Sequence, residues 1–342
     1  MDFSSDTSAP AHPLVIEALD HVNSGNAPSY GSDDATAHVK SLLETIFETE
    51  LEIWLCASGT ASNALALSCF CPPTGAIVCH EEAHIERDER GAPEFFSGGG
   101  KLHLLPGSDG KIDEQKLKIA LSAIDRSFVH ETPAHVLSLT NLTECGTSHS
   151  AAETSRRADL AKQYGLCVQL DGARLANAIA HTGETPADLT WKAGVDVLTL
   201  GLTKTGAMGC EIIILFGDAR AKLPELKARA KRSGHMPPKM RYLAAQAKAL
   251  LTDELWLDLA RHANQMAQQL ATALCAVPGS ARAYPTNGNE VFVRLPEGLA
   301  QKLETAGTKF YPWPGGSHRF VCSWATTQED IDTFIAALNQ IG

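Results

Sequence analysis

Short apolar runs alternate with helix-like patterns through the first two thirds of the chain. Runs of four to eight apolar or branched residues are typical of buried strands, and a 3.6-residue apolar period is typical of helices. The pattern predicts helices at 60–70 and 151–165 and strands at 51–56, 76–80, 134–140, 166–172, 195–201 and 210–217. Strands that alternate with helices indicate βαβ units. We therefore expect an α/β fold with a mostly parallel sheet that helices cover on both faces.

The pattern changes after about residue 220. The segment 221–241 is basic and contains Pro-Pro, and a long amphipathic helix is predicted at 253–277. A strand, a helix, a strand and a final helix follow it, and these predict a smaller α/β unit at the C-terminus. We expect a large domain over residues 1–245, which includes the N-terminal segment, and a small domain over 246–342.

Composition excludes several classes of protein. The net charge is −11, which argues against a general nucleic-acid or anionic-membrane binder. The nine cysteines are odd in number and form no CxxC pair, so we expect reduced, mostly buried thiols in a cytoplasmic protein rather than disulfides or zinc sites. No signal peptide and no transmembrane helix is predicted, because no apolar run reaches about 18 residues.

Three strand ends carry residues with possible chemistry. Ser58, Gly59 and Thr60 lie between a strand and a helix, where backbone N–H groups can bind a phosphate, although such a turn is more often a simple helix cap. Asp171 follows another strand, and Lys204 follows a third. A phosphate cradle, a carboxylate for a ring nitrogen and an amine for an aldehyde are the three handles that pyridoxal 5′-phosphate requires.

Two histidines extend this set. His84 follows a strand end and is a candidate to lie on the cofactor ring, and His130 stands just before the strand 134–140. The acidic residues around His84 have no recognised metal-loop spacing, so we predict a solvated acidic face and no metal site. For His130, a surface loop position is as consistent with the sequence as a catalytic role.

Several motifs together resemble one family, the low-specificity L-threonine aldolases, which have the aspartate-aminotransferase-like fold of pyridoxal-phosphate enzymes (fold type I). The resemblance extends over nearly the whole chain. The motifs that carry it are "DFSSDT" at the start, "YGSDD" (30–34), "ASGTASN" (57–63), "EEAHIERDERGAPEF" (81–95), "QLDGARLANA" (169–178), "TWKAGVDVLTLGLTKTG" (190–206), "KMR" (239–241) and "HRFVCSW" (318–324).

The resemblance implies a role for each matching residue. Lys204 would form the Schiff base, Asp171 would pair with the pyridine nitrogen, and His84 would stack on the cofactor ring. The expected phosphate ligands are Gly59, Thr60 and Arg232; the expected substrate contacts are Ser5, Tyr30, His130, Arg174 and Arg319. The resemblance further implies a homotetramer in which active sites are shared between chains, so that Tyr30 and Arg241 would act across a subunit boundary and Arg232 would bind the phosphate of a neighbouring chain.

The implied activity is retro-aldol cleavage of L-threonine, L-allo-threonine and related amino acids to glycine and an aldehyde. A preference for phenylserine, or transamination, elimination or racemisation on the same fold, stays open, because fold does not determine chemistry. A binding protein with a degenerate cofactor site is a third possibility, against which the intact Asp171 and Lys204 argue. His130, His84 and an ordered water are each candidates for the general base.

Overall fold

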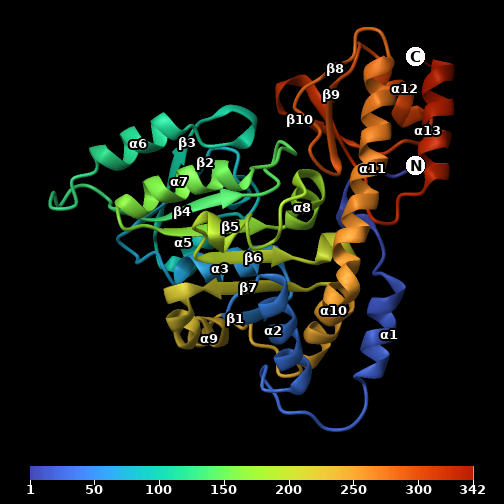
Figure 1. Cartoon of the computed structure of the whole chain (residues 1–342). Coiled ribbons are helices and arrows are strands. Elements are labelled where there is room, and N and C mark those ends of the chain that lie inside the picture. The colour runs from blue at the N-terminus through green and yellow to red at the C-terminus, as the bar shows by residue number, and fades with distance from the viewer. Residues whose placement is uncertain (342) are drawn as a thin grey trace.

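The computed structural model describes residues 1–341, and its largest feature is a seven-stranded sheet (Figure 1). The strand order is β1-β7-β6-β5-β4-β2-β3. The strands are β1 (Leu51–Cys56), β2 (Ala76–His80), β3 (Lys101–Leu105), β4 (Ala134–Thr140), β5 (Cys167–Gly172), β6 (Val197–Gly201) and β7 (Glu211–Phe216). All six strands predicted in this region are present, within two residues at each end.

Most neighbouring strands of this sheet are parallel. The pairs β2–β3, β2–β4, β4–β5 and β5–β6 are parallel, whereas β7 pairs antiparallel with both β1 and β6. Parallel strands in α/β units place all their carboxyl ends on one edge, and ligands bind at that edge. The predicted α/β class with a mostly parallel sheet is confirmed.

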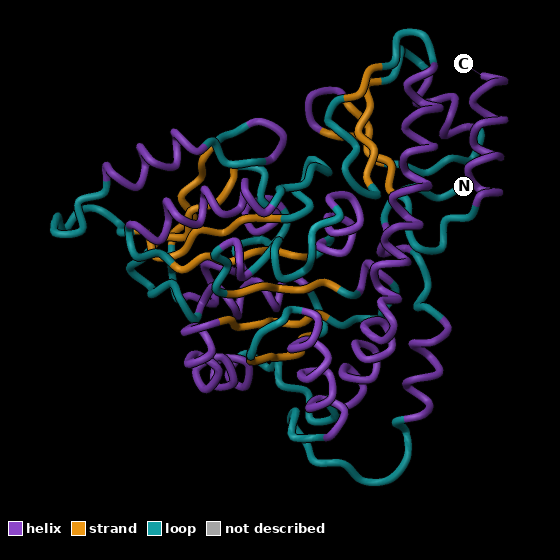
Figure 2. Tube along the Cα trace, in the orientation of Figure 1, coloured by secondary structure: helices purple, strands orange, loops and turns teal. Residues whose placement is uncertain are grey.

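Helices surround the sheet and fill the sequence between strands (Figure 2). Helix α3 packs on β1, β6 and β7, while α7 lies against β4 and β5. The helices up to residue 251 are α1 (Pro13–His21), α2 (Asp34–Ile46), α3 (Gly59–Ser68), α4 (His84–Arg87), α5 (Ala92–Ser97), α6 (Glu114–Ala123), α7 (Ala151–Gln163), α8 (Leu175–Thr182), α9 (Leu223–Arg232) and α10 (Arg241–Leu251). The basic, proline-containing segment therefore contributes α9 and the start of α10.

A second, four-stranded antiparallel sheet lies in the C-terminal part, beside the long helix α11 (Figure 1). Its order is β10-β11-β9-β8. The elements here are α11 (Leu255–Ala276), β8 (Ala281–Arg282), β9 (Glu290–Arg294), α12 (Leu299–Thr305), β10 (Tyr311–Trp313), β11 (Ser317–Val321) and α13 (Gln328–Ile341). The smaller C-terminal α/β unit is confirmed as a feature of the fold.

The buried residues of α11 belong to two different apolar cores. The first core ends with Ala260, and the second contains Met266 and the following turns of the same helix. Phe3 belongs to the second core, where its ring packs edge-on against Phe334 at 5.6 Å between centroids. The predicted division between residues 245 and 246 falls inside α10 and stays a prediction, and its last residue, 342, lies outside the described residues.

Candidate active site

A cleft of about 540 Å³ opens at the carboxyl ends of β4, β5 and β6. Eight of the residues singled out in the sequence line it: Ser5, Gly59, Thr60, His84, Asp171, Arg174, Lys204 and Arg319. They come from the N-terminal segment, from both sheets and from four separate turns. The fold therefore assembles one polar site from residues up to 314 positions apart, from Ser5 to Arg319.

The N-terminus of α3 faces this cleft. Ser58 caps the helix by accepting a hydrogen bond from the backbone N–H of Ala61 at 3.3 Å, which leaves the first N–H groups free for an anion. A Cβ placed on Gly59 would meet no atom within 4 Å. The chain itself does not need glycine here, and the empty space is suited to close approach by a phosphate group.

Asp171 is fixed at the end of β5 by two hydrogen bonds. Its Oδ1 accepts from the backbone N–H of Ala173 at 2.9 Å, and its Oδ2 accepts from the side-chain amide of Asn63 at 2.8 Å. The same amide donates to Glu89 at 2.9 Å, and Glu89 contacts Nδ1 of His84 at 2.8 Å. Although burial lowers it, the pKa of His84 is raised overall, because Glu89 and Asp171 stabilise the imidazolium.

Lys204 lies in the short turn Thr203–Thr205 that follows β6. Its Nζ forms no hydrogen bond or ion pair with any residue in 1–341, although the side chain is half-buried in the cleft. The neighbouring Thr203 hydroxyl donates to Glu211 at 2.5 Å, and this bond pins the turn to the start of β7. An unpaired lysine amine in a cleft is the arrangement that Schiff-base chemistry uses.

Two arginines face two acids on the other side of the cleft. Nε and Nη2 of Arg174 donate to Asp6 at 2.8 and 3.1 Å, and its Nη1 lies 3.2 Å from Glu290. Arg319 lies 3.7 Å from Glu290 and 4.8 Å from the ring centre of Trp313, and its buried Nε has no partner within 1–341. A free guanidinium N–H beside a second arginine can bind a carboxylate.

The pKa of Asp6, one of the two acids that hold Arg174, is strongly lowered. Burial would raise the pKa of Asp6, yet the charges of Arg174 and Lys204 outweigh it and lower that pKa to about 2. Asp6 and Glu290 raise the pKa of Arg174 in turn. The ion pair of Arg174 with Asp6 is therefore charged at neutral pH, and these charge-assisted contacts fix the orientation of Arg174.

His130 is not brought to this cleft. It lies exposed in the turn before β4, packed at 5.0 Å between centroids against Phe128. A residue before a parallel strand lies at the amino edge of the sheet, opposite the edge that holds the cleft. The role at the substrate hydroxyl, expected from the family resemblance, has no support within the cleft of a single chain and stays a prediction.

Tyr30 and Arg232 also lie outside the residues that line the cleft. Tyr30 is exposed, with the ammonium of Lys231 at 4.7 Å from its ring centre, and Arg232 ends α9 on the surface. Both were expected to act across a boundary between chains, and that expectation stays a prediction.

Sequence reasoning missed several residues of the cleft. Glu144 follows the carboxyl end of β4, Glu211 begins β7 and Glu290 begins β9, and all three line the site. Asn63, one turn into α3, bridges Asp171 and Glu89. Glu144 and Glu211 each follow or begin a strand at the ligand edge, which is a signal that the sequence contains.

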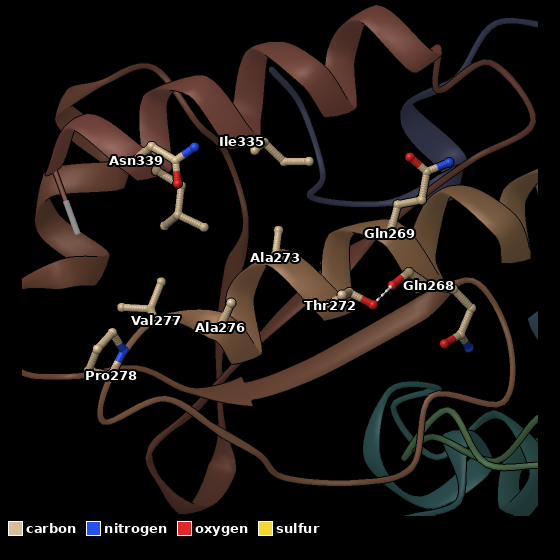
Figure 3. Close-up of a pocket in the computed structure, with 10 residues that line it drawn as sticks. Gln268, Gln269, Thr272, Ala273, Ala276, Val277, Pro278, Ile335 and Asn339 are labelled. Carbon is tan, nitrogen blue, oxygen red and sulfur yellow. Dashed lines mark hydrogen bonds between the residues drawn. The ribbon is translucent and has the colours of Figure 1, made fainter.

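A second hollow of about 650 Å³ lies between α11 and α13 (Figure 3). Its lining is made of alanines, aliphatic side chains, Pro278 and uncharged polar groups such as Gln269 and Thr272. No lining residue can ionise, so this hollow has no acid, base or nucleophile. Within 1–341 there is also no group of three His, Cys, Asp or Glu side chains placed to hold a metal, and no helix long and apolar enough to cross a membrane.

Comparisons with known proteins agree with this geometry. Residues 2–296 match the beta-eliminating lyase family. The low specificity L-threonine aldolase of Pseudomonas aeruginosa is 38% identical over 330 residues, which cover 96% of this chain and 94% of that protein. The aldolase of the same description from Pseudomonas sp. is 36% identical over 340 residues, covering 99% and 97%.

Solved structures agree as well. A Leishmania major threonine aldolase superposes with a TM-score of 0.92 at 28% identity, covering 99% of this chain and 98% of that one. A putative L-allo-threonine aldolase from Listeria monocytogenes, at 15% identity and a TM-score of 0.77, shares the fold. The chain therefore belongs to the beta-eliminating lyase family and, within it, to the low-specificity L-threonine aldolases.

Proposed function

We propose that this protein is a pyridoxal-phosphate enzyme that cleaves L-threonine, L-allo-threonine and other L-β-hydroxy-α-amino acids to glycine and an aldehyde. The observation that carries the proposal is the unpaired amine of Lys204 in a cleft that also contains Asp171 and two arginines. The activities named for the Pseudomonas relatives support it.

The residues present fit the cofactor at two points that the chain leaves open, and the substrate at a third. The space at Gly59 fits a phosphate, the Nζ of Lys204 fits an aldehyde, and the unpartnered Nε of Arg319 fits the substrate carboxylate. When bound, pyridoxal phosphate supplies an electron sink that accepts the pair released when the Cα–Cβ bond breaks.

The protein residues provide charge and orientation. Asp171, held in place by Asn63 and Ala173, stabilises a protonated ring nitrogen, because an opposite charge nearby favours the charged form. Arg174 and Arg319 bind the substrate carboxylate and thereby orient the bonds at Cα. His84, with Nδ1 held on Glu89, contributes a ring of fixed orientation to the same cleft.

A substrate panel tests the reaction directly. We expect the purified protein, supplied with pyridoxal phosphate, to release acetaldehyde from L-threonine and L-allo-threonine, and to spare the D-isomers. Phenylserine belongs in the same panel, because benzaldehyde release at a higher kcat/KM would assign the preference to aromatic substrates. Transfer of the amino group to a keto acid without aldehyde release would contradict the proposal.

Replacing Lys204 tests the anchor. We expect Lys204→Ala to lose the visible absorbance of the bound cofactor and to lose aldehyde release by at least about 10³-fold, since covalent attachment and amine chemistry both disappear. Lys162→Ala is a matched control, because Lys162 pairs with Asp196 on the surface at 3.1 Å. Full colour and activity in Lys204→Ala would exclude the assignment.

We further infer that the protein is a cytoplasmic homotetramer with shared active sites. Apolar side chains stay exposed near the cleft and on α1, among them Met208, Tyr30, Leu14 and Ile16, and burial against a second chain would remove them from water. The free cysteines, most of them buried, are typical of a reducing compartment. Mass measurement in solution tests the tetramer.

A further inference from the structure

Glu144 is a cleft residue to which no role has been given so far. We propose that Glu144 is the general base that takes the proton of the substrate β-hydroxyl. This proposal rests on the aldolase function proposed above. Glu144 follows β4 and lines the cleft together with Lys204 and Arg174. It therefore stands at the edge of the sheet where the reacting atoms must lie, and His130 does not.

The orientation of the carboxyl group is defined by the backbone. Oε1 of Glu144 accepts a hydrogen bond from the backbone N–H of His84 at 2.8 Å. No other hydrogen bond and no ion pair involves this carboxyl group in residues 1–341, so Oε2 remains for a ligand. A base held through one oxygen, with its second oxygen open to the cleft, is arranged for proton transfer.

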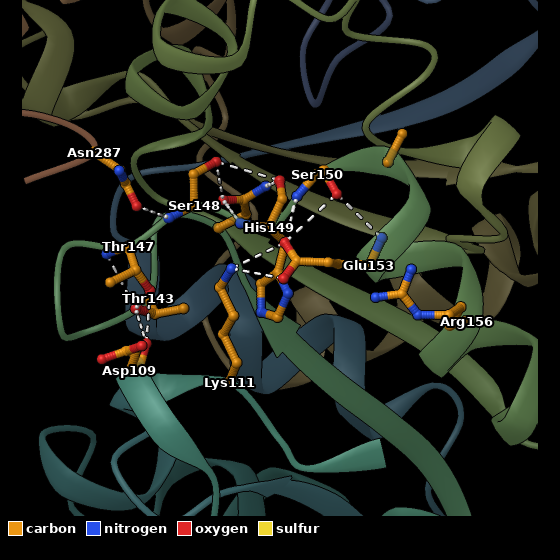
Figure 4. Close-up of polar contacts among 12 residues, drawn as sticks. Asp109, Lys111, Thr143, Thr147, Ser148, His149, Ser150, Glu153, Arg156 and Asn287 are labelled. Atoms are coloured by element: carbon orange, nitrogen blue, oxygen red, sulfur yellow. Dashed lines mark hydrogen bonds and ion pairs between the residues drawn. The ribbon is translucent and has the colours of Figure 1, made fainter. Parts of the chain in front are cut away.

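The loop that carries Glu144 is held by side chains on both flanks (Figure 4). The hydroxyls of Thr143 and Thr147 lie 2.8 Å apart, and each lies within donating distance of the backbone oxygen of Asp109, at 3.0 and 2.6 Å. Their two hydrogens can make two of these three contacts at a time. Asn141 Nδ2 donates to the backbone oxygen of His149 at 3.0 Å. These bonds fix the loop at positions 141, 143, 147 and 149, and a fixed loop keeps a base within reach of its proton.

The Lys111–Glu153 pair, at 2.9 Å, extends the same support to the first turn of α7 (Figure 4). Ser150 and Glu153 form a capping box there, in which each side chain bonds to the other residue's backbone N–H. The loop therefore ends on a well-capped helix, and the support is made of side chains that do not themselves enter the cleft.

The proton affinity of Glu144 is suited to this role. Burial and the charge of Asp171 raise its pKa to about 7, against opposing effects from the backbone and from His84. Arg174 and the thiols of Cys79 and Cys145 are further titratable groups that lie close enough to interact electrostatically with Glu144. A base whose pKa is near the working pH combines the correct protonation state with a useful driving force.

The alternatives within the cleft are less suited. His84 has its Nδ1 bonded to Glu89, and Glu89 and Asp171 raise its pKa, which favours the imidazolium over the neutral base. Glu211 also has a pKa of about 7, but its Oε1 accepts the Thr203 hydroxyl. Of Glu144 and Glu211, Glu144 is the residue whose carboxyl group is bound only by a backbone N–H.

The step balances without another reactant. The O–H proton moves to Glu144, the electrons of that bond form the C=O of the aldehyde, and the Cα–Cβ bond breaks. Its electron pair remains on the glycine fragment, and one proton later joins Cα. One proton leaves oxygen and one reaches carbon, so no oxidant or reductant is needed.

The test separates cleavage from cofactor function. We expect Glu144→Gln to lower kcat for L-threonine by about 10²–10⁴-fold. Exchange of the glycine Cα hydrogen with deuterium oxide needs no hydroxyl proton, so it should stay close to the wild-type rate. Glu82→Gln is the control, because Glu82 pairs with Arg87 outside the cleft lining. Cleavage by Glu144→Gln at close to the wild-type rate would overturn the proposal.

Two further measurements extend the test, the first on the apoprotein and the second on another variant. The apoprotein should show an infrared band of a protonated carboxyl group that disappears with rising pH near 7 and is reduced in Glu144→Gln. In Glu144→Ala, added formate should restore part of the cleavage rate. If Glu144→Gln loses both colour and glycine exchange, the residue is structural and the proposal fails.

The experiments give different results if the proposed aldolase function is wrong and if only the role of Glu144 as the base is wrong. If the wild-type protein exchanges glycine hydrogen but cleaves no β-hydroxy amino acid, the aldolase function itself fails. If the wild type cleaves threonine and Glu144→Gln cleaves it equally well, only the assignment of Glu144 is wrong.

Discussion

Two buried acids in the same cleft show how the environment of a residue decides its charge. Asp6 bonds to the guanidinium of Arg174, and its pKa falls to about 2. Glu211 has the Thr203 hydroxyl as its hydrogen-bond donor, and burial raises its pKa to about 7 in spite of that bond and of Lys204. A guanidinium compensates for lost hydration and a hydroxyl does not.

The raised pKa of Glu211 predicts a pH-dependent stability. The native carboxyl binds its proton up to about pH 7, whereas the unfolded one releases it near the ordinary value of 4.5. The contribution of Glu211 to the free energy of unfolding is therefore full below pH 4.5 and is lost as the pH rises through 7. Glu211→Gln removes this pH-dependent loss of stability, because a glutamine side chain does not ionise. We expect the apoprotein variant to have a higher Tm than wild type at pH 8 and no gain at pH 5.

Glu17→Gln on the exposed face of α1 is the control for this measurement, because Glu17 is in contact with solvent. Its Tm should follow the wild type at both pH values. If Glu211→Gln raised the Tm equally at pH 5 and pH 8, burial of the ionised carboxyl group would not be the cause of the increase.

Site residues could be predicted from the sequence where they lie at the end of an apolar run that predicts a strand. Asp171 and Lys204 follow apolar runs that became β5 and β6, so their side chains reached the cleft as expected. His130 precedes its strand and lies outside the cleft of its own chain, so its expected role stays a prediction. Glu144 was missed although it follows the same strand. The contact of Arg174 with Asp6, 168 positions away, has no local signal at all.

At the scale of elements, apolar runs were sufficient for the central strands. Residues 212–215 are four consecutive Ile or Leu residues, and such a run is typical of a strand buried on both faces. The edge strand β3 was not predicted, because "KLHLL" is only partly buried and includes Lys101 and His103. An apolar run reveals a strand only where the side chains of that strand are buried, and the side chains of this edge strand are only partly buried.

The N-terminus of α3 is the element whose sequence and function are most directly linked. Gly59→Ala places a methyl group where no atom of the chain lies within 4 Å, so the apoprotein should keep its Tm. The methyl group would occupy the phosphate space, so we expect pyridoxal phosphate to bind about tenfold or more weakly, equivalent to about 1.4 kcal/mol. Titration of the apoprotein with cofactor measures this.

Gly201→Ala is the matched comparison for Gly59→Ala. Its Cβ would lie 2.6 Å from the Cα of Ala173, which forces a movement of the backbone between β5 and β6. It should lower the Tm of the apoprotein, whereas Gly59→Ala should not. Equal loss of Tm in both variants would contradict a ligand role for the space at Gly59.

At the scale of the whole molecule, the first six residues join the second sheet to the cleft. The backbone N–H of Phe3 donates to Lys309 at 2.9 Å, and its carbonyl accepts from Val321 at 2.8 Å. Ser5 and Asp6 follow at once, and Asp6 holds Arg174 in the large sheet region. The N-terminal segment thus connects the C-terminal core to the arginine that faces the substrate (Figure 1).

This connection predicts that a core residue outside the cleft changes substrate binding. Phe3 is fully buried against Phe334, and Phe3→Ala should cost about 3–5 kcal/mol of stability through loss of burial and an unfilled cavity. Because Asp6 is three residues further along, the variant should also raise KM for L-threonine more than it lowers kcat. Phe95→Ala, whose side chain is 81% exposed, should change neither quantity. A destabilised Phe3→Ala enzyme with unchanged KM would show that the segment stabilises the C-terminal core without positioning Arg174.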